Sequence, residues 1–144
     1  MATRRATAVW EGNLADGHGR ADLESGVASG LDVNWRARTE GGAETSPEEL
    51  LAAAHAACFS MALSHELSQA GHEPTRLSVA AAVSFDPAGD GFAVTTSKLR
   101  VRGVVPGIDA DEFRQYAEAA GEGCPISGAL KGNVEISVDE AELE

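Results

Sequence analysis

The chain has 144 residues, a length typical of one domain, so we expect a single domain over residues 1–144. Its 23 acidic residues against 11 Lys and Arg give a net charge of −12, which argues against binding to nucleic acid or to an anionic membrane surface. No secretory signal is visible at the start, so we expect a cytoplasmic protein. Two cysteines are too few for a disulfide scaffold, and we expect them either to pack or to carry redox chemistry.

The N-terminal third is predicted to form short strands. Residues 3–10 and 18–24 are the weaker candidates, with a turn over residues 13–19 between them. Apolar and polar residues alternate over residues 31–38, the pattern of a half-buried strand. This strand would carry Arg36 and Arg38 on its polar face.

Residues 46–70 predict one long helix. Ser46 is a good N-cap, Glu49 completes a capping box and Gly71 ends the helix. At 1.5 Å per residue the helix is about 37 Å long, so it would run through the whole domain. Because residues 50–63 are apolar on all sides, we expect burial all round, and this stretch is too short to cross a bilayer.

Two more strands follow the helix. Residues 77–85 alternate, residues 86–91 form a turn cluster, and the alternation resumes from Phe92 to Val101. Its phase shifts before Leu99, so we expect a bulge near Ser97-Lys98.

The last third predicts a helix and a final strand. Asp109 and Glu112 form a second capping box that opens a helix to about residue 120, closed by glycines. Cys124-Pro125 opens a short helical turn, and residues 134–138 form the last strand. The order β-β-β-α-β-β-α-β indicates an α+β fold with an antiparallel sheet and a long buried central helix.

The two cysteines fit a peroxidatic and resolving pair. Cys58, in the middle of the long helix, could equally be a plain core residue. Cys124 stands at a helix start, where the dipole favours a thiolate, and Gly121 and Gly123 would let it move. A rigid thiol oxidised to sulfenic acid and a mobile thiol that condenses with it would make a disulfide.

Cys58 needs a cation nearby, because burial would raise its pKa and leave it as an unreactive thiol. Arg36 and Arg38 are the stronger candidates, since arginine is always charged. His55 lies one turn before Cys58, but a histidine on an apolar helix is more often a hydrogen-bonded core residue.

Several motifs together resemble those of the OsmC/Ohr family of thiol peroxidases, and their form is closer to the OsmC branch. The motifs span nearly the whole chain in the family's order: Trp10-Glu11-Gly12, Glu24-Ser25-Gly26, residues 45–51, residues 54–63, residues 105–109 and residues 123–127.

The resemblance implies an α+β fold built as an intertwined homodimer with active sites at the interface. It implies reduction of organic hydroperoxides, and more weakly of hydrogen peroxide, with an external dithiol and no metal or other cofactor, in defence against oxidative or osmotic stress. Carried over by motif, Cys58 is the peroxidatic cysteine and Cys124 the resolving one. Arg38 is the family's arginine, with Arg36 as the nearby alternative, and Glu48 is its glutamate.

Glu48 and Cys58 lie about 15 Å apart along one straight helix, so one arginine could hardly touch both. We therefore expect the site to take groups from two chains. Two other functions stay open, a dimeric protein that binds an apolar ligand without turnover and a dimeric redox sensor.

Overall fold

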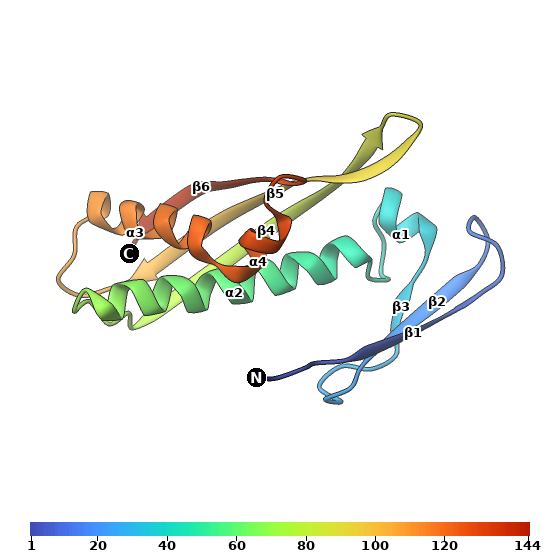
Figure 1. The fold of residues 1–144 in the computed structure, drawn as a ribbon, viewed down its shortest axis with the longest axis horizontal. Helices are drawn as coiled ribbons and strands as arrows, with labels where there is room; N and C mark the ends of the chain where they lie inside the picture. The colour runs from blue at the N-terminus through green and yellow to red at the C-terminus, as the bar shows by residue number, and fades with distance from the viewer. The chain divides into compact units, whose positions relative to one another are not determined.

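The computed structural model describes residues 1–144, and their internal contacts divide into two compact units, Met1–Leu50 and Leu51–Glu144. The expectation of a single domain therefore stays a prediction, and each unit is described by itself. The elements in chain order (Figure 1) are β1 (Ala6–Glu11), β2 (His18–Leu23), β3 (Leu31–Val33), α1 (Trp35–Thr39), α2 (Pro47–Gln69), β4 (Arg76–Ala88), β5 (Gly91–Val104), α3 (Ala110–Gly123), α4 (Pro125–Leu130) and β6 (Glu135–Leu143).

The first unit holds an antiparallel sheet in the order β1-β2-β3, then α1 and the start of α2. The predicted strand over residues 31–38 is wrong beyond Val33. Asn34 has extended backbone angles, and its side chain accepts a hydrogen bond from the N–H of Ala37 at 2.7 Å, which caps α1. Arg36 and Arg38 consequently lie on a helical turn and not on a strand.

The long helix α2 is confirmed, with Ser46 as its N-cap and Gly71 at its end, but Glu49 does not complete the predicted capping box. Ser46 Oγ accepts from the N–H of Glu49 at 3.1 Å, while the Glu49 carboxylate accepts from the hydroxyl of Thr45 at 2.8 Å. At the other end Gly71 has a φ of 85°, and the N–H of His72 reaches back to the Leu67 carbonyl at 2.8 Å. This left-handed glycine and its six-to-one hydrogen bond form a Schellman motif.

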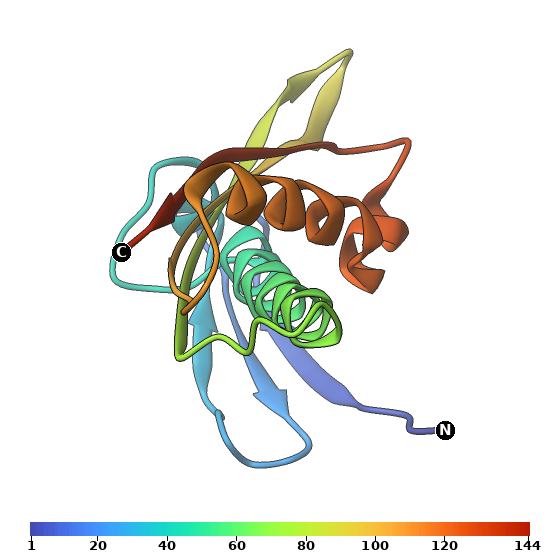
Figure 2. The same cartoon turned by 90° about the vertical axis from the view of Figure 1, so that its left-hand side faces the viewer.

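The second unit is a three-stranded sheet in the order β4-β5-β6 with α2 and α3 packed on one face (Figure 2). β4 and β5 form the expected antiparallel hairpin, but β6 runs parallel to β5. The α3–α4 connection is a crossover that returns the chain to the same end of the sheet, so β6 enters in the direction of β5. The bulge lies at Thr95, because Ser84 pairs with Thr96 and Phe85 with Val94, two residues before the predicted place.

One face of α2 forms the centre of this core. His55, Phe59, Leu63 and Leu67 are fully buried, whereas the apolar residues on the other side of the helix, including Ala54 and Met61, are exposed. Met61 is 74% exposed, so the all-round burial expected from the sequence is not present within a single chain. By length and composition alone α2 would be long and apolar enough to cross a membrane, but the face that packs on the sheet is that of a core helix.

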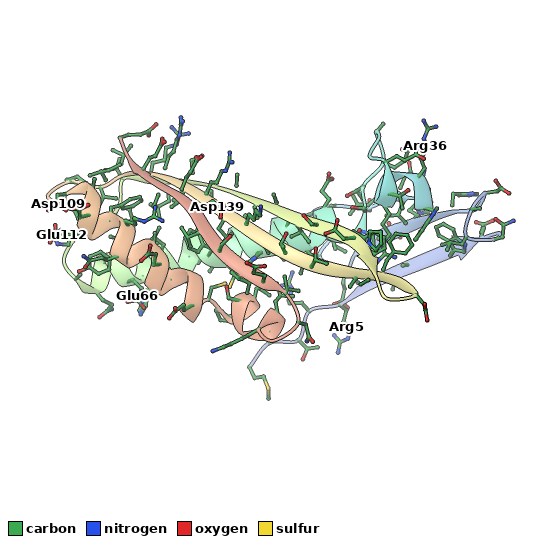
Figure 3. All side chains as sticks on the ribbon, turned by 90° about the horizontal axis from the view of Figure 1, so that it is seen from above. Arg5, Arg36, Glu66, Asp109, Glu112 and Asp139 are labelled. Carbon is green, nitrogen blue, oxygen red and sulfur yellow. The ribbon has the colours of Figure 1, made fainter.

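The second long helix, α3, begins with the predicted capping box. Asp109 accepts from the N–H of Glu112 at 2.9 Å, and Glu112 accepts from the N–H of Asp109 at 3.2 Å; the two side chains lie together in Figure 3. The helix continues to Gly123, beyond its predicted end, so Gly121 lies inside it. There Gly121 is buried, and an added Cβ would stand 2.8 Å from Cγ2 of Val138.

We expect Gly121→Ala to lower the free energy of unfolding by about 1–3 kcal/mol, because Val138 on β6 would have to give way. Gly123→Ala is the matched control in the same helix, since an added Cβ there meets nothing within 4 Å. It should leave stability unchanged or raise it by up to about 1 kcal/mol. Urea unfolding of the two variants measures both effects, and equal midpoints would contradict the packing role of Gly121.

Candidate active site

The two cysteines meet in the second unit. Cys58 lies on α2, and Cys124 stands between the end of α3 and the start of α4. Both thiols are free, and they lie close enough for each to shift the pKa of the other. The sequence left their separation open, and the expected mobility of Cys124 is not needed to bring them together.

The two thiols differ in accessibility. Cys58 is partly exposed, whereas Cys124 is completely buried. On the exposed side of α2 the residues one turn before and after Cys58 are Ala54 and Met61, both apolar and exposed. In a single chain, solvent therefore reaches Cys58 but not Cys124.

The thiols also differ in acidity. Burial raises the pKa of Cys58, the neighbouring Cys124 raises it further, and the N–H of Ile126 offsets only part of this. Burial alone would raise the pKa of Cys124 as well, but the Cys58 thiol and the N–H and hydroxyl of Ser127 outweigh it, so that the pKa is lowered. Because burial raises the pKa of Cys58, this thiol needs a cation from elsewhere to become a thiolate.

His55 is a fully buried core histidine with both ring nitrogens hydrogen-bonded. Nδ1 lies 2.6 Å from Oγ of Ser97 on β5, and Nε2 lies 2.8 Å from Oγ of Ser127 on α4. Sequence reasoning favoured such a core histidine but missed both serines. Ser97 did leave a signal, because it is a polar residue in the inward phase of Leu99 and Val101.

Burial lowers the pKa of His55 from its usual 6.5. As the pH falls through 6.5, His55 therefore binds a proton in the unfolded chain but stays neutral in the folded protein. We expect the free energy of unfolding to decrease as the pH falls below about 6.5, and His55→Gln to remove that part of the decrease. His65→Gln, at an exposed position of the same helix, should keep it; an unchanged slope in His55→Gln would contradict the assignment.

The first unit holds an ion pair between Arg38 and Glu48. Nε and Nη2 of Arg38 each lie 2.9 Å from Oε1 of Glu48, whose side chain is only 6% exposed. Oε2 of Glu48 is buried and has no hydrogen-bond partner, so this carboxylate retains room for one more donor. Arg36 instead pairs with Glu40 at 3.1 Å and points away from the chain (Figure 3), with 81% of its side chain exposed.

A metal site and a ligand pocket beside the cysteines both have little support in the structure. No group of three or more histidine, cysteine and acidic side chains lies close enough to hold a metal ion. Phe59, the apolar residue next to Cys58 in the sequence, is fully buried in the core and lines no pocket beside the cysteine. A cavity of about 500 Å³ in the second unit is lined by α3, α4 and β6, and neither cysteine belongs to its lining.

Known proteins resemble this chain over most of its length. A family model described as "OsmC-like protein" matches residues 39–139. The "Peroxiredoxin OsmC" of Escherichia coli (strain K12) is 44% identical over 133 residues, 92% of this chain and 93% of that protein. The "Organic hydroperoxide resistance protein OhrB" of Bacillus subtilis (strain 168) is 32% identical over 124 residues, 84% of this chain and 88% of that protein. The crystal structure of the Bacillus subtilis protein OhrB superposes with a TM-score of 0.73 at 30% identity, covering 97% of this chain and 98% of that one.

Proposed function

Because the chain belongs to the OsmC family, we propose that it is a thiol peroxidase that reduces organic hydroperoxides with Cys58 and Cys124. Relatives whose names state peroxiredoxin or organic hydroperoxide resistance support the peroxidase activity. The observation that carries the two-cysteine proposal is the proximity of a partly exposed thiol and a buried one in the same unit, each of which shifts the pKa of the other. The proposed place of action is the cytoplasm, in defence against oxidative or osmotic stress.

The proposed reaction has three balanced steps. The Cys58 thiolate attacks the distal oxygen of ROOH; the O–O bond breaks, the alcohol leaves with one proton, and Cys58 becomes a sulfenic acid. The Cys124 sulfur then attacks the Cys58 sulfur; the S–S bond forms, the S–O bond breaks and water leaves. An external dithiol exchanges with this disulfide, restores both thiols and is itself oxidised to a disulfide.

In this proposal Arg38 holds Cys58 as a thiolate and stabilises the charge that develops on the peroxide oxygens. Its ion pair with the buried Glu48 supports the role, because a fixed carboxylate orients the guanidinium. The raised pKa of Cys58 supports the need for such a cation. Arg36 fits the role less well, because its pair with Glu40 is exposed.

We also propose a homodimer in which Arg38 and Glu48 of one chain serve Cys58 of the other. The axial distance of about 15 Å between Glu48 and Cys58 along α2 supports two chains over one. The exposed apolar side of α2 supports a second copy as its partner, since a lone exposed helix face of this kind is costly in water.

Organic hydroperoxides are proposed as better substrates than hydrogen peroxide. Ala54 and Met61 lie on the side of α2 proposed to face the second copy, so a substrate that enters the interface to reach Cys58 would bury apolar area against them, worth about 25 cal/mol per Å². Hydrogen peroxide has no such area to bury. The apolar approach to Cys58 therefore raises the rate with organic substrates only.

Peroxide consumption with excess dithiol tests the proposed function. We expect many turnovers per chain and a faster reaction with cumene hydroperoxide than with H₂O₂. Consumption that stops after one equivalent of peroxide per chain, with the disulfide as the end state, would instead favour a redox sensor. No consumption at all would favour a protein that binds an apolar ligand in a dimer interface.

A further inference from the structure

Three buried and hydrogen-bonded polar side chains, Ser97, His55 and Ser127, form a row across the core of the second unit, and the row ends on α4, the short helix that Cys124 precedes. Ser97, His55 and Cys124 are fully buried, and Ser127 is 3% exposed. Three different elements supply the row, since Ser97 comes from β5, His55 from α2 and Ser127 from α4. The two contacts of His55, at 2.6 and 2.8 Å, fix the imidazole between the serines.

The surroundings of this row make a purely structural role costly. Its neighbours in the core are apolar, among them Phe59, Leu63 and Leu99. A buried polar group must find hydrogen-bond partners, and a core of this kind is normally filled by apolar side chains. The row nevertheless ends at Ser127, three residues after Cys124, which is the one buried thiol of the protein.

We propose that Ser127 donates a hydrogen bond to the sulfur of Cys124 and that His55, held by Ser97, positions the Ser127 hydroxyl for this. The inference rests on the proposed two-cysteine reaction and assigns these residues to its disulfide-forming step. Ser127 touches a reacting atom, whereas His55 and Ser97 act through it as positioning residues.

One placement of the protons lets each group from Ser97 to Ser127 donate a hydrogen bond to the next group in the row, toward Cys124. A neutral imidazole carries one donor and one acceptor nitrogen. With the proton on Nε2, His55 donates to Ser127 and accepts from Ser97 at Nδ1, so the Ser127 hydroxyl is free to donate to a Cys124 thiolate. The lowered pKa of His55 keeps this ring neutral, and the titratable groups around Cys124 are then the Cys58 thiol and this histidine.

Disulfide formation is faster when Cys124 is a thiolate, because the thiolate is the nucleophile. The Cys124 thiol loses its proton, the thiolate attacks the sulfur of the Cys58 sulfenic acid, and the S–O bond breaks as the S–S bond forms. The departing hydroxide takes up one proton, so that thiol and sulfenic acid give a disulfide and water. Cys124 is oxidised and Cys58 reduced, and no further reagent is required.

Rapid mixing with one equivalent of cumene hydroperoxide separates the two steps. In Ser127→Ala we expect the alcohol to form at the wild-type rate, but the disulfide to form about tenfold more slowly, as for the loss of one hydrogen bond to a charged group. The Cys58 sulfenic acid should accumulate, be trapped by a carbon nucleophile, and be oxidised further to sulfinic acid by excess peroxide. His55→Leu should behave in the same way, and His55→Gln should recover part of the rate because its amide can donate to Ser127.

A titration distinguishes this role from a structural one. In the Cys58→Ser background, the thiolate absorbance of Cys124 should appear at higher pH in Ser127→Ala and His55→Leu. The matched control is Ser137→Ala, whose hydroxyl donates to Asp139 at the surface and should change neither rate nor titration. If His55→Leu does not fold, Ser127→Ala decides alone, because it removes a single oxygen atom.

The outcomes separate the two proposals. A wild type that forms alcohol, together with a Ser127→Ala variant that matches it in disulfide formation and titration, overturns this inference only. A wild type that forms no alcohol overturns the proposed function and this inference with it.

Discussion

Cys58→Ser should lose all hydroperoxide turnover, whereas Cys124→Ser should react with one equivalent of peroxide per chain and then stop. Cys58 is the thiol that a substrate can reach, and a serine hydroxyl cannot become a sulfenic acid. Without Cys124 the sulfenic acid has no partner within the chain and persists. Product analysis after mixing with a few equivalents of cumene hydroperoxide per chain gives the number of alcohols formed per chain in each variant.

The control for this pair of variants is Ser60→Ala, on the same helix as Cys58. The Ser60 hydroxyl donates to the Ala57 carbonyl within α2, so its loss should leave turnover unchanged. A Cys58→Ser variant as active as wild type would show that the peroxidase reaction does not start at this cysteine. Turnover in Cys124→Ser at the wild-type rate, with a dithiol, would show that resolution does not need Cys124.

The helices were the most predictable part of the fold, because their signals are local. Ser46 and Gly71 fix the ends of α2 through contacts to residues at most five positions away, and Asp109 with Glu112 does the same for α3. Such contacts depend on little beyond the chain's immediate neighbours. The sequence therefore contains the information that locates these ends.

Each wrong prediction about the fold concerns a contact that the alternation of apolar and polar residues does not reveal. Residues 31–38 alternate as a strand should, but the Asn34 side chain offers the backbone a helical turn after Val33. The direction of β6 depends on the end of the sheet at which the α3–α4 crossover finishes, and no local sequence pattern predicts that. Gly121 looked like a flexible helix end because its close approach to Val138 is a contact between distant segments.

The sequence names candidate residues for the site but does not give their geometry. The motifs around Cys58 and Cys124 locate both cysteines in the sequence, and the pairing of Arg38 with Glu48 follows from the same resemblance. The proximity of the thiols could not be foreseen, because it depends on how α4 lies against α2. The same holds for the hydrogen bond between Ser127 and His55, although Ser127 belongs to the motif at residues 123–127.

Arg38→Ala should lower kcat/KM for cumene hydroperoxide about 100- to 1,000-fold at neutral pH, the cost of removing one preorganised charge-stabilising donor. The reason is that burial and Cys124 keep the pKa of Cys58 raised, so a chain without the cation holds Cys58 as a thiol. Since high pH supplies the thiolate without the cation, the activity of the variant should rise with pH more steeply than that of wild type. Stopped-flow rates across a pH series measure both the loss and its recovery.

Arg36→Ala is the matched control, since Arg36 stands on the same short helix and its ion pair with Glu40 is exposed. Exposed pairs contribute roughly 0–1 kcal/mol, so this variant should keep its activity. An equal loss in both variants would indicate that α1 as a whole, and not the Arg38 guanidinium, supports the reaction. A loss in Arg38→Ala that no pH restores would contradict its role in ionising Cys58.

Mixed subunits then decide whether Arg38 serves Cys58 of its own chain or of a second copy. When Arg38→Ala and Cys58→Ser chains are co-expressed in equal amounts, each parent homodimer is inactive. Half of the random dimers carry one copy of each chain, and a site shared across chains leaves one intact Arg38–Cys58 set in each of them. Activity should therefore recover to about a quarter of wild type. A site within one chain pairs every remaining Cys58 with a missing Arg38, and the mixture would stay as inactive as its parents.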